Sequence, residues 1–349
     1  MYEKIFQIND NYAIIQNAQS ELLYNYEGIN SGNGLFTIAI PTYRRKEFFF
    51  EAFDSALKQN YDGPYEIIIV DNDDLRVELN DKINHVKETI NSLNLSFVKI
   101  SYYWNQKNIG VNNFNRCMEL ANTKYVGLLH DDDMLLPSYL SEMYHVIKKA
   151  DADAIGCSLC VIDREGNRKE RFAFFKNVWR NRAIRFYEYD FFIDRGVMFP
   201  GFMLKKDVAI ASGGIDKNWG PCTDYVWQWN VAKRFKVFNV CAATYLYRVA
   251  DNDSTRYDTQ LELCKMPCRL MRQYYIDKKN KIPKWLYKTH ASCYLKMLID
   301  NANNIWSIKI NHEQLLQEFS LFNPNFVIYN LWRIIRKTYG LYKGIFNVI

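Results

Sequence analysis

Three consecutive aspartates, Asp131 to Asp133, are the residues of this sequence most suited to chemistry. Adjacent carboxylates repel one another and destabilise a fold unless a cation offsets their charge. Hard divalent ions such as Mg²⁺ and Mn²⁺ bind carboxylate oxygens, commonly only one or two, which leaves positions for phosphate oxygens and water. The triplet therefore predicts a metal site that bridges to a diphosphate.

Three more polar loops follow short apolar runs, at Pro41–Arg45, Asp71–Asp74 and Asn105–Gly110. Asp and Asn are also common in turns and helix caps, so a structural role is the alternative for any one loop. The sequence has neither G-x-G-x-x-G after a strand nor G-x-x-x-x-G-K-[ST], the glycine-rich patterns that hold phosphates. A bound diphosphate would therefore be held mainly through the metal.

The elements that must position these loops alternate between short β-branched runs and amphipathic segments. This alternation predicts an α/β fold with a parallel, doubly wound sheet, in which ligands bind at the carboxyl ends of strands. We expect strands at Phe36–Ile40, Glu66–Val70, Phe97–Tyr103, Tyr125–Leu129, Ala154–Ile162 and Met198–Leu204. We expect helices at Lys46–Lys58, Leu79–Leu93, Asn112–Ala121 and Ser138–Lys149, and a further helix starting near Asp224.

Composition narrows the class of protein. The 349 residues are 48% hydrophobic and 24% charged, which excludes a disordered chain, and the net charge of +6 does not favour a nucleic-acid partner. Aromatic residues reach 16%, a content that suits either a sugar site or a membrane surface. We expect no signal peptide and no transmembrane helix, hence a cytoplasmic protein. The Cys157-x-x-Cys160 pair fits a buried strand better than a zinc site.

Four motifs, taken in order and spacing, resemble the family 2 glycosyltransferases of GT-A fold. They are Phe36-Thr-Ile-Ala-Ile-Pro-Thr-Tyr-Arg44, Glu66-Ile-Ile-Ile-Val-Asp71, Asn108-Ile-Gly110 with Asn115, and Gly127-Leu-Leu-His-Asp-Asp-Asp-Met-Leu-Leu-Pro137. The resemblance covers about residues 35–250 and implies a Rossmann-like mixed sheet with helices on both faces. We expect a leader over residues 1–34, a GT-A domain over 35–255 divided near 135, and a helical region over 256–349.

The resemblance implies a nucleotide-sugar site at the three loops named above and beside the acidic motif, which is the triplet Asp131 to Asp133. Its residues are Pro41, Thr42, Tyr43, Arg44, Asp71, Asn108, Gly110 and Asp131. Tyr43 would lie near a base and Arg44 near a phosphate. The family usually continues the second motif as Asp-Gly-Ser, whereas this chain has Asn72-Asp73-Asp74, so the nucleoside contacts differ in detail.

For the Mn²⁺ or Mg²⁺ that the resemblance implies, Asp132 is the first predicted ligand. Asp133 would be the second ligand or a brace, and Asp131 would reach the ribose or help the metal. His130 is either a ligand or a buried, capping histidine. Relatives often carry a histidine where this chain has Ala250, so the third ligand is either Asp251 or water.

Similar enzymes place the catalytic base at the start of a helix, which makes Asp224 the candidate here. It would remove the acceptor hydroxyl proton during a direct displacement that inverts the anomeric carbon. The alternative role is that of an acid that stabilises the helix N-terminus. Trp219 and Tyr225 are predicted to bind the acceptor, whereas Trp227 and Trp229 are expected in the core.

The tail from Asn330 to Ile349 combines basic and aromatic residues. It either lies on the inner face of the cytoplasmic membrane or packs on the domain. We therefore expect an inverting hexosyl- or N-acetylhexosaminyltransferase of polysaccharide synthesis. It would use a UDP-sugar and a glycan or lipid-linked saccharide acceptor. The alternatives are a sugar-1-phosphate nucleotidyltransferase and a catalytically silent carbohydrate-binding protein.

Overall fold

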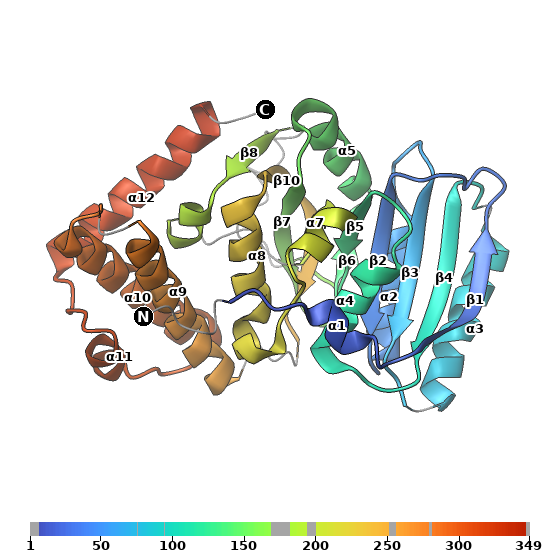
Figure 1. The fold of residues 1–349 in the computed structure, drawn as a ribbon, viewed down its shortest axis with the longest axis horizontal. Coiled ribbons are helices and arrows are strands. Elements are labelled where there is room, and N and C mark those ends of the chain that lie inside the picture. Colours follow the sequence, from blue (N-terminus) through green and yellow to red (C-terminus); the bar gives the residue numbers. More distant parts are fainter. Residues whose placement is uncertain are drawn as a thin grey trace.

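The structure is a computed structural model that describes residues 7–74, 76–93, 95–168, 182–193, 200–250, 256–278 and 281–346. Within these residues a mixed sheet of ten strands forms the centre of the molecule (Figure 1). Its order is β1-β4-β3-β2-β5-β9-β7-β10-β6, and β8 also pairs with β10. The strands are β1 (Ser20–Glu27), β2 (Phe36–Thr42), β3 (Tyr65–Asp71), β4 (Val98–Asn105), β5 (Tyr125–Leu128), β6 (Met134–Leu135), β7 (Ala154–Ile162), β8 (Ala183–Phe186), β9 (Met203–Lys205) and β10 (Val237–Arg248).

The run β4-β3-β2-β5 is parallel, as the sequence predicts, and β7 and β10 form a second parallel pair. Every residue of β2 and β3 is buried, which is why both read as continuous apolar runs rather than as alternating ones. The remaining pairs make the sheet mixed, because β9 runs antiparallel to β5 and β7. The strand expected at Met198–Leu204 is only Met203–Lys205, and residues 198–199 lie outside the described part of the chain.

The first described residues are not the leader and loop that we expected. Residues 20–27 form β1, which pairs antiparallel with β4 from Ser20 opposite Asn105 to Glu27 opposite Lys99. Before it, α1 (Asn11–Ile15) is capped by Asp10 and lies against α4. The polar composition of this segment reflects an edge strand whose burial alternates, so a loop prediction based on polarity was wrong there.

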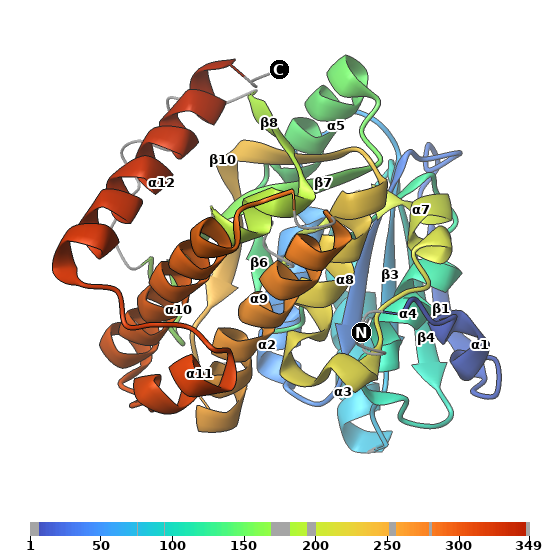
Figure 2. The same cartoon turned by 60° about the vertical axis from the view of Figure 1, so that its left-hand side comes forward.

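Helices cover both faces of the sheet. One core joins the sheet to α2, α3 and α5, and the other joins it to α4, α7, α8 and the C-terminal helices (Figures 1 and 2). Their bounds are α2 (Lys46–Leu57), α3 (Arg76–Ser92), α4 (Asn113–Leu120), α5 (Tyr139–Ala150), α7 (Lys206–Ala211), α8 (Thr223–Arg234), α9 (Tyr257–Asp277), α10 (Lys284–Trp306), α11 (His312–Glu318) and α12 (Phe326–Phe346). Short 3₁₀ helices are η2 (Gly110–Asn112), η4 (Glu188–Phe192) and η5 (Lys217–Cys222). Among the described helices, none combines the length and apolar character that crossing a bilayer requires.

Strand register brings the polar loops to one edge of the sheet. Thr42 lies opposite Asp71, and Asp71 lies opposite Trp104, so β2, β3 and β4 end side by side. At the other half of the sheet, β10 pairs with β6, the short strand directly after the aspartate triplet. The acidic motif is therefore enclosed between the loop after β2 and the end of β10.

Candidate functional site

Asp133 is the fully buried member of the acidic motif. One of its oxygens accepts a hydrogen bond from the Tyr245 hydroxyl at 2.9 Å, and the other accepts from the backbone N–H of Arg248 at 2.7 Å. Burial, together with the neighbouring Asp132 charge, raises the pKa of Asp133 well above its ordinary value. Asp133 therefore braces the motif against β10.

The side chain of Arg248 also holds the acidic motif in place. It is fully buried, and its Nε donates to the carbonyl of Asp132 at 2.8 Å. Its other donors reach the Arg164 carbonyl and the Glu51 carboxylate on α2. The sequence did not assign Arg248 a role, although this residue lies two positions before Ala250, where relatives often carry a histidine.

Asp131 turns away from its two neighbours toward the loop after β2. One oxygen of its carboxylate accepts from the Thr42 hydroxyl at 2.9 Å and from the Tyr43 N–H at 3.1 Å. Burial, together with the charge of Asp132, raises the pKa of Asp131 to about 7. Thr42, Tyr43 and Asp131, all predicted to bind the nucleotide sugar, are thus in direct contact.

The group with metal-binding geometry consists of His130, Asp132 and Asp133. Their ligand atoms all lie within 4.8 Å of one another, and no other such group occurs in the described ranges. Burial lowers the pKa of His130, which favours the neutral imidazole that a metal binds. Two carboxylates and one imidazole suit Mn²⁺, so these residues fit the predicted ion. Asp131 lies outside this group, and Asp251 lies outside the described residues.

Arg45 contacts the predicted first ligand directly. Its guanidinium lies 2.6 Å from Asp132, and the sequence had not singled it out. The neighbouring Arg44, predicted to bind a phosphate, instead lies over the Tyr43 ring and 3.6 Å from the exposed Asp74. The two arginines differ in partner although they are adjacent, because the chain turns sharply between β2 and α2.

Asp71, predicted to contact the nucleoside, is completely buried in a charged network. Lys82 of α3 lies 3.1 Å from Asp71 and 3.3 Å from Asp73, and all three side chains are fully buried. Asp71 also accepts from the Tyr102 hydroxyl and from the Asp73 N–H. Burial raises the pKa of Asp71, while the Lys82 ammonium opposes that shift. In the free chain, this network fixes the Asp71–Asp74 loop.

Asn72 links the three loops that the sequence predicted to meet. Its backbone N–H donates to the Thr42 carbonyl at 2.9 Å, and its side chain accepts from Asn105 at 2.7 Å. The Asn72 amide also donates to the Gly110 carbonyl. Gly110 has a φ of +58°, which glycine tolerates better than other residues, and its N–H bonds the Asn108 side chain. Asn72, the first residue at which this chain departs from the family's usual Asp-Gly-Ser, therefore holds the loops together.

Asp224 occupies the first turn of α8, as predicted, and remains partly exposed. Burial raises the pKa of Asp224 to about 6, and one oxygen accepts from the Tyr225 N–H. The chain reaches α8 from Ile215, whose N–H and C=O both bond the buried Asn115 side chain. The neighbouring Phe114 ring lies 5.3 Å from the His130 ring, so α4 contacts both the acidic motif and the approach to α8.

The aromatic residues beside Asp224 mostly face the core. Trp219 is only 4% exposed, and Trp227 and Trp229 are completely buried, the latter two as expected. Tyr225 packs edge-on against Phe191 and donates its hydroxyl to the Phe191 carbonyl. These contacts do not support the predicted acceptor-binding role of Trp219 and Tyr225.

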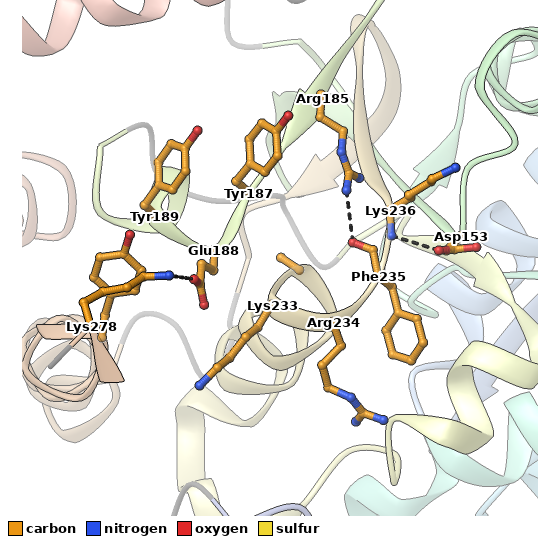
Figure 3. Close-up of a pocket in the computed structure, with 12 residues that line it drawn as sticks. Asp153, Arg185, Tyr187, Glu188, Tyr189, Lys233, Arg234, Phe235, Lys236 and Lys278 are labelled. Carbon is orange, nitrogen blue, oxygen red and sulfur yellow. Dashed lines mark hydrogen bonds and ion pairs between the residues drawn. The ribbon is translucent and has the colours of Figure 1, made fainter. Parts of the chain in front are cut away.

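A hollow of about 590 Å³ lies at the amino-terminal end of β10 (Figure 3). The acidic motif contacts the other end of this strand, at Arg248. Residues of β8, η4, α8 and α9 line it, including Arg185, Tyr187, Lys233 and Lys278. Lys278 pairs with Glu188 at 2.9 Å, and Arg185 donates to the Val237 carbonyl. None of the predicted site residues lines this hollow, so it is separate from the candidate site.

Comparison with known proteins identifies what this arrangement belongs to. Residues 37–212, just over half of the chain, match the family model described as glycosyl transferase family 2. A GalNAc(5)-diNAcBac-PP-undecaprenol beta-1,3-glucosyltransferase of Campylobacter jejuni is 27% identical over 139 residues, which are 39% of this chain and 41% of that enzyme. The matched part is thus less than half of that enzyme's own length.

Two further proteins resemble longer parts of the chain. An uncharacterized glycosyltransferase of Methanocaldococcus jannaschii is 22% identical over 299 residues, which cover 84% of this chain and 91% of that protein. Crystal structures of residues 1–349 of S. aureus TarS have the same fold; the one with UDP-GlcNAc has a TM-score of 0.54 at 14% identity and covers 81% and 80% of the two chains. The expected GT-A fold is confirmed.

Replacing Lys82 with Met should destabilise the protein strongly. The substitution keeps the side-chain volume but removes the cation between the buried Asp71 and Asp73 carboxylates, which costs about 3–5 kcal/mol. Urea unfolding followed by circular dichroism measures the difference. Lys87→Met, at an exposed position of the same helix, is the control and should cost less than about 1 kcal/mol. Equal losses in the two variants would contradict the role assigned to Lys82.

Proposed function

The chain belongs to glycosyl transferase family 2, and we propose that it transfers a sugar from a UDP-sugar to a hydroxyl of a glycan or lipid-linked saccharide, with inversion at the anomeric carbon. The observation that carries this proposal is the meeting of four polar loops at one sheet edge. There the loops after β2 and β3 contact each other through Asn72, and the loop after β2 contacts the acidic motif through Asp131. This is an arrangement for a nucleotide and its diphosphate.

The donor side would use the exposed surface of the loop after β2. Tyr43 is 37% exposed, and the Arg44 guanidinium lies 5.0 Å above its ring. The tyrosine ring could stack on a flat base, and the guanidinium could bind a phosphate. Asp131 lies beside Tyr43 and suits a ribose hydroxyl. The crystal structures of TarS with UDP and with UDP-GlcNAc, which share the fold, support uridine nucleotides as the first donors to test.

His130, Asp132 and Asp133 would hold the divalent ion. A bound Mn²⁺ or Mg²⁺ supplies charge that offsets the negative charge developing on the leaving diphosphate. The chain's own part is to hold the carboxylates in place before the ion arrives. Arg248 and Tyr245 do this, because they fasten Asp132 and Asp133 to β10.

Asp224 would act as the general base. Its carboxylate takes the acceptor hydroxyl proton while the acceptor oxygen forms a bond to the anomeric carbon. The bond between that carbon and the diphosphate oxygen breaks, and its electron pair leaves with the nucleoside diphosphate. With a pKa of about 6, Asp224 is mostly ionised at pH 7 yet basic enough to accept the proton.

The acceptor would be presented at a membrane surface through α12. One side of this helix docks on the protein: Trp332 donates to His290, Tyr329 to Asp300, and Tyr339 to Asp190. The other side exposes apolar residues, namely Phe326, Val327, Leu331, Ile334, Ile335 and Tyr342, which are 54–83% exposed. Exposed Arg333 and Lys337 flank them, and no acidic residue follows Glu318.

An apolar face of this kind requires a partner, since a large exposed apolar patch marks an interaction site. A helix that combines apolar and basic residues suits an anionic membrane surface. The Campylobacter relative, by its name, acts on an undecaprenol-linked saccharide. We therefore assign the exposed face of α12 to peripheral membrane contact and a lipid-linked saccharide to the acceptor.

The test of the reaction is a transfer assay with purified protein, Mn²⁺ and a panel of UDP-, GDP- and dTDP-sugars. We expect transfer, or slow hydrolysis without acceptor, from a UDP-sugar. Asp224→Asn should lower the rate by at least about a hundredfold, because general-base catalysis contributes this much, while UDP binding stays nearly unchanged. Asp207→Asn is the control: Asp207 also begins a helix and bonds the next N–H, so it should have no effect.

Two results would contradict these assignments. Loss of UDP binding in Asp224→Asn would mean that this residue belongs to the donor site. Pyrophosphate release from a nucleoside triphosphate and a sugar phosphate, without sugar transfer, would instead favour a nucleotidyltransferase.

The pH dependence of kcat/KM should report the Asp224 carboxylate. Because the base must be ionised, kcat/KM should be level above a pH of about 6 and fall tenfold per pH unit below it. The profile is measured with saturating metal and with Asp207→Asn as the control. A rate that rises as the pH falls through this region would contradict the role of Asp224 as base.

The membrane proposal predicts sedimentation with phosphatidylcholine vesicles that contain phosphatidylglycerol, and weaker binding without it or at high salt. The double variant Ile334→Glu/Ile335→Glu should reduce vesicle binding about tenfold or more, because burial of two such side chains contributes on the order of 2 kcal/mol. Val77→Glu, at an apolar position of α3 that is 72% exposed, is the control. A dimer that the double variant breaks, with no vesicle binding, would instead assign this face to a second copy.

A further inference from the structure

Arg45 occupies the carboxylate that the metal would use. Its Nη1 lies 2.6 Å from Oδ2 of Asp132, whose side chain is only 11% exposed. We propose that Arg45 is a donor-positioning residue: it pairs with Asp132 in the free chain and moves to the donor diphosphate when a divalent ion takes Asp132. This inference rests on the proposed function, because it requires a diphosphate donor and a metal at the same site.

The backbone around Arg45 directs its side chain toward the acidic motif. Arg44 and Arg45 both adopt left-handed conformations, with φ of 58° and 54°, which are costly for residues other than glycine. The segment is fastened on both sides: the Tyr43 N–H bonds Asp131, and the Arg45 carbonyl accepts from the Phe49 N–H at the start of α2. The fold thus maintains an unfavourable backbone that places a cation on Asp132.

Electrostatics makes the arginine and the metal competitors. A guanidinium and a divalent ion repel each other, and both would bind the Asp132 carboxylate. The neighbouring carboxylates have other partners: one oxygen of Asp131 accepts from Thr42 and Tyr43, and the two oxygens of Asp133 accept from Tyr245 and Arg248. Once displaced, Arg45 remains next to the metal site, where two oxygens of a diphosphate can accept parallel hydrogen bonds from its planar guanidinium.

This arrangement couples the two ligands. Metal binding alone leaves Arg45 without its carboxylate, whereas metal binding with a diphosphate gives Arg45 a new anionic partner. UDP should therefore raise the affinity for Mn²⁺, and by linkage Mn²⁺ should raise the affinity for UDP by the same factor. The metal and the donor would bind together. Until they bind, Arg45 would offset part of the negative charge of the aspartate triplet.

The experiment measures free Mn²⁺ by electron paramagnetic resonance during titration of the full chain, with and without UDP. We expect Arg45→Gln to bind Mn²⁺ about three- to fivefold more tightly than the unmodified chain without UDP, the range of a partly exposed ion pair. The same variant should lose most of the gain in Mn²⁺ affinity that UDP produces. Arg45→Lys should retain part of it, because a lysine keeps the charge but not the bidentate geometry.

Lys46→Gln is the matched control. Lys46 is the next residue and also a cation, but its partner at 2.8 Å is Asp81 of α3, outside the acidic motif. It should change neither the Mn²⁺ affinity nor its coupling to UDP. The loop must also remain folded, so equal unfolding midpoints of Arg45→Gln and Lys46→Gln accompany the titration.

The outcomes separate the two proposals. The role of Arg45 is overturned if Arg45→Gln leaves the coupling between UDP and Mn²⁺ unchanged, or if this variant binds Mn²⁺ more weakly without UDP. Either result leaves the proposed function intact. An unmodified chain that binds neither Mn²⁺ nor UDP contradicts the proposed donor site itself, and the role of Arg45 with it.

Discussion

The buried guanidinium of Arg248 is the contact on which the candidate site depends. It joins β10 to the Asp132 carbonyl and to Glu51 on α2, while the backbone N–H of Arg248 donates to Asp133. Three adjacent carboxylates repel one another, so their positions must be fixed by contacts with the rest of the fold. The buried Arg248 side chain supplies such a contact, because it bonds the Asp132 carbonyl and sets the position of the motif relative to β10. Strand β10 thereby supports the acidic motif, although the two are more than 100 residues apart in the chain.

Charge balance distinguishes the two acidic regions of the site. Asp71 and Asp73 have a permanent counterion, Lys82, which is as deeply buried as they are, so their network is a fixed part of the scaffold. Asp132 pairs with Arg45, whose side chain is 44% exposed. Buried pairs resist separation because an uncompensated charge in the interior is costly, whereas a half-exposed partner is exchanged easily. The difference in burial therefore separates a fixed ion-pair network at Asp71 and Asp73 from a partly exposed ion pair at Asp132.

The high aromatic content resolves into several uses that composition could not separate. Phe49, Phe53, Trp227 and Trp229 fill the two cores beside the sheet. Tyr102 and Tyr245 are structural hydrogen-bond donors to Asp71 and Asp133. In α12, Tyr329, Trp332 and Tyr339 dock the helix through their polar atoms, which leaves its aliphatic face outward. Aromatic residues with a polar edge can serve both purposes, so their number alone did not indicate their position.

The local sequence pattern was sufficient to predict strands β2 to β5, the helices between them and the loops at the strand ends. A buried parallel strand appears in the sequence as a continuous apolar run, and its loop follows directly. The pattern also located the aspartate triplet and Asp224 at a helix start. The tertiary structure decided the rest. It placed His130 rather than Asp131 with Asp132 and Asp133, buried Trp219 and made residues 20–27 an edge strand. It also buried Lys82 between Asp71 and Asp73, and it brought Arg45 and Arg248 onto carboxylates far away in the chain. Those partners depend on strand order and burial, which sequence spacing does not encode.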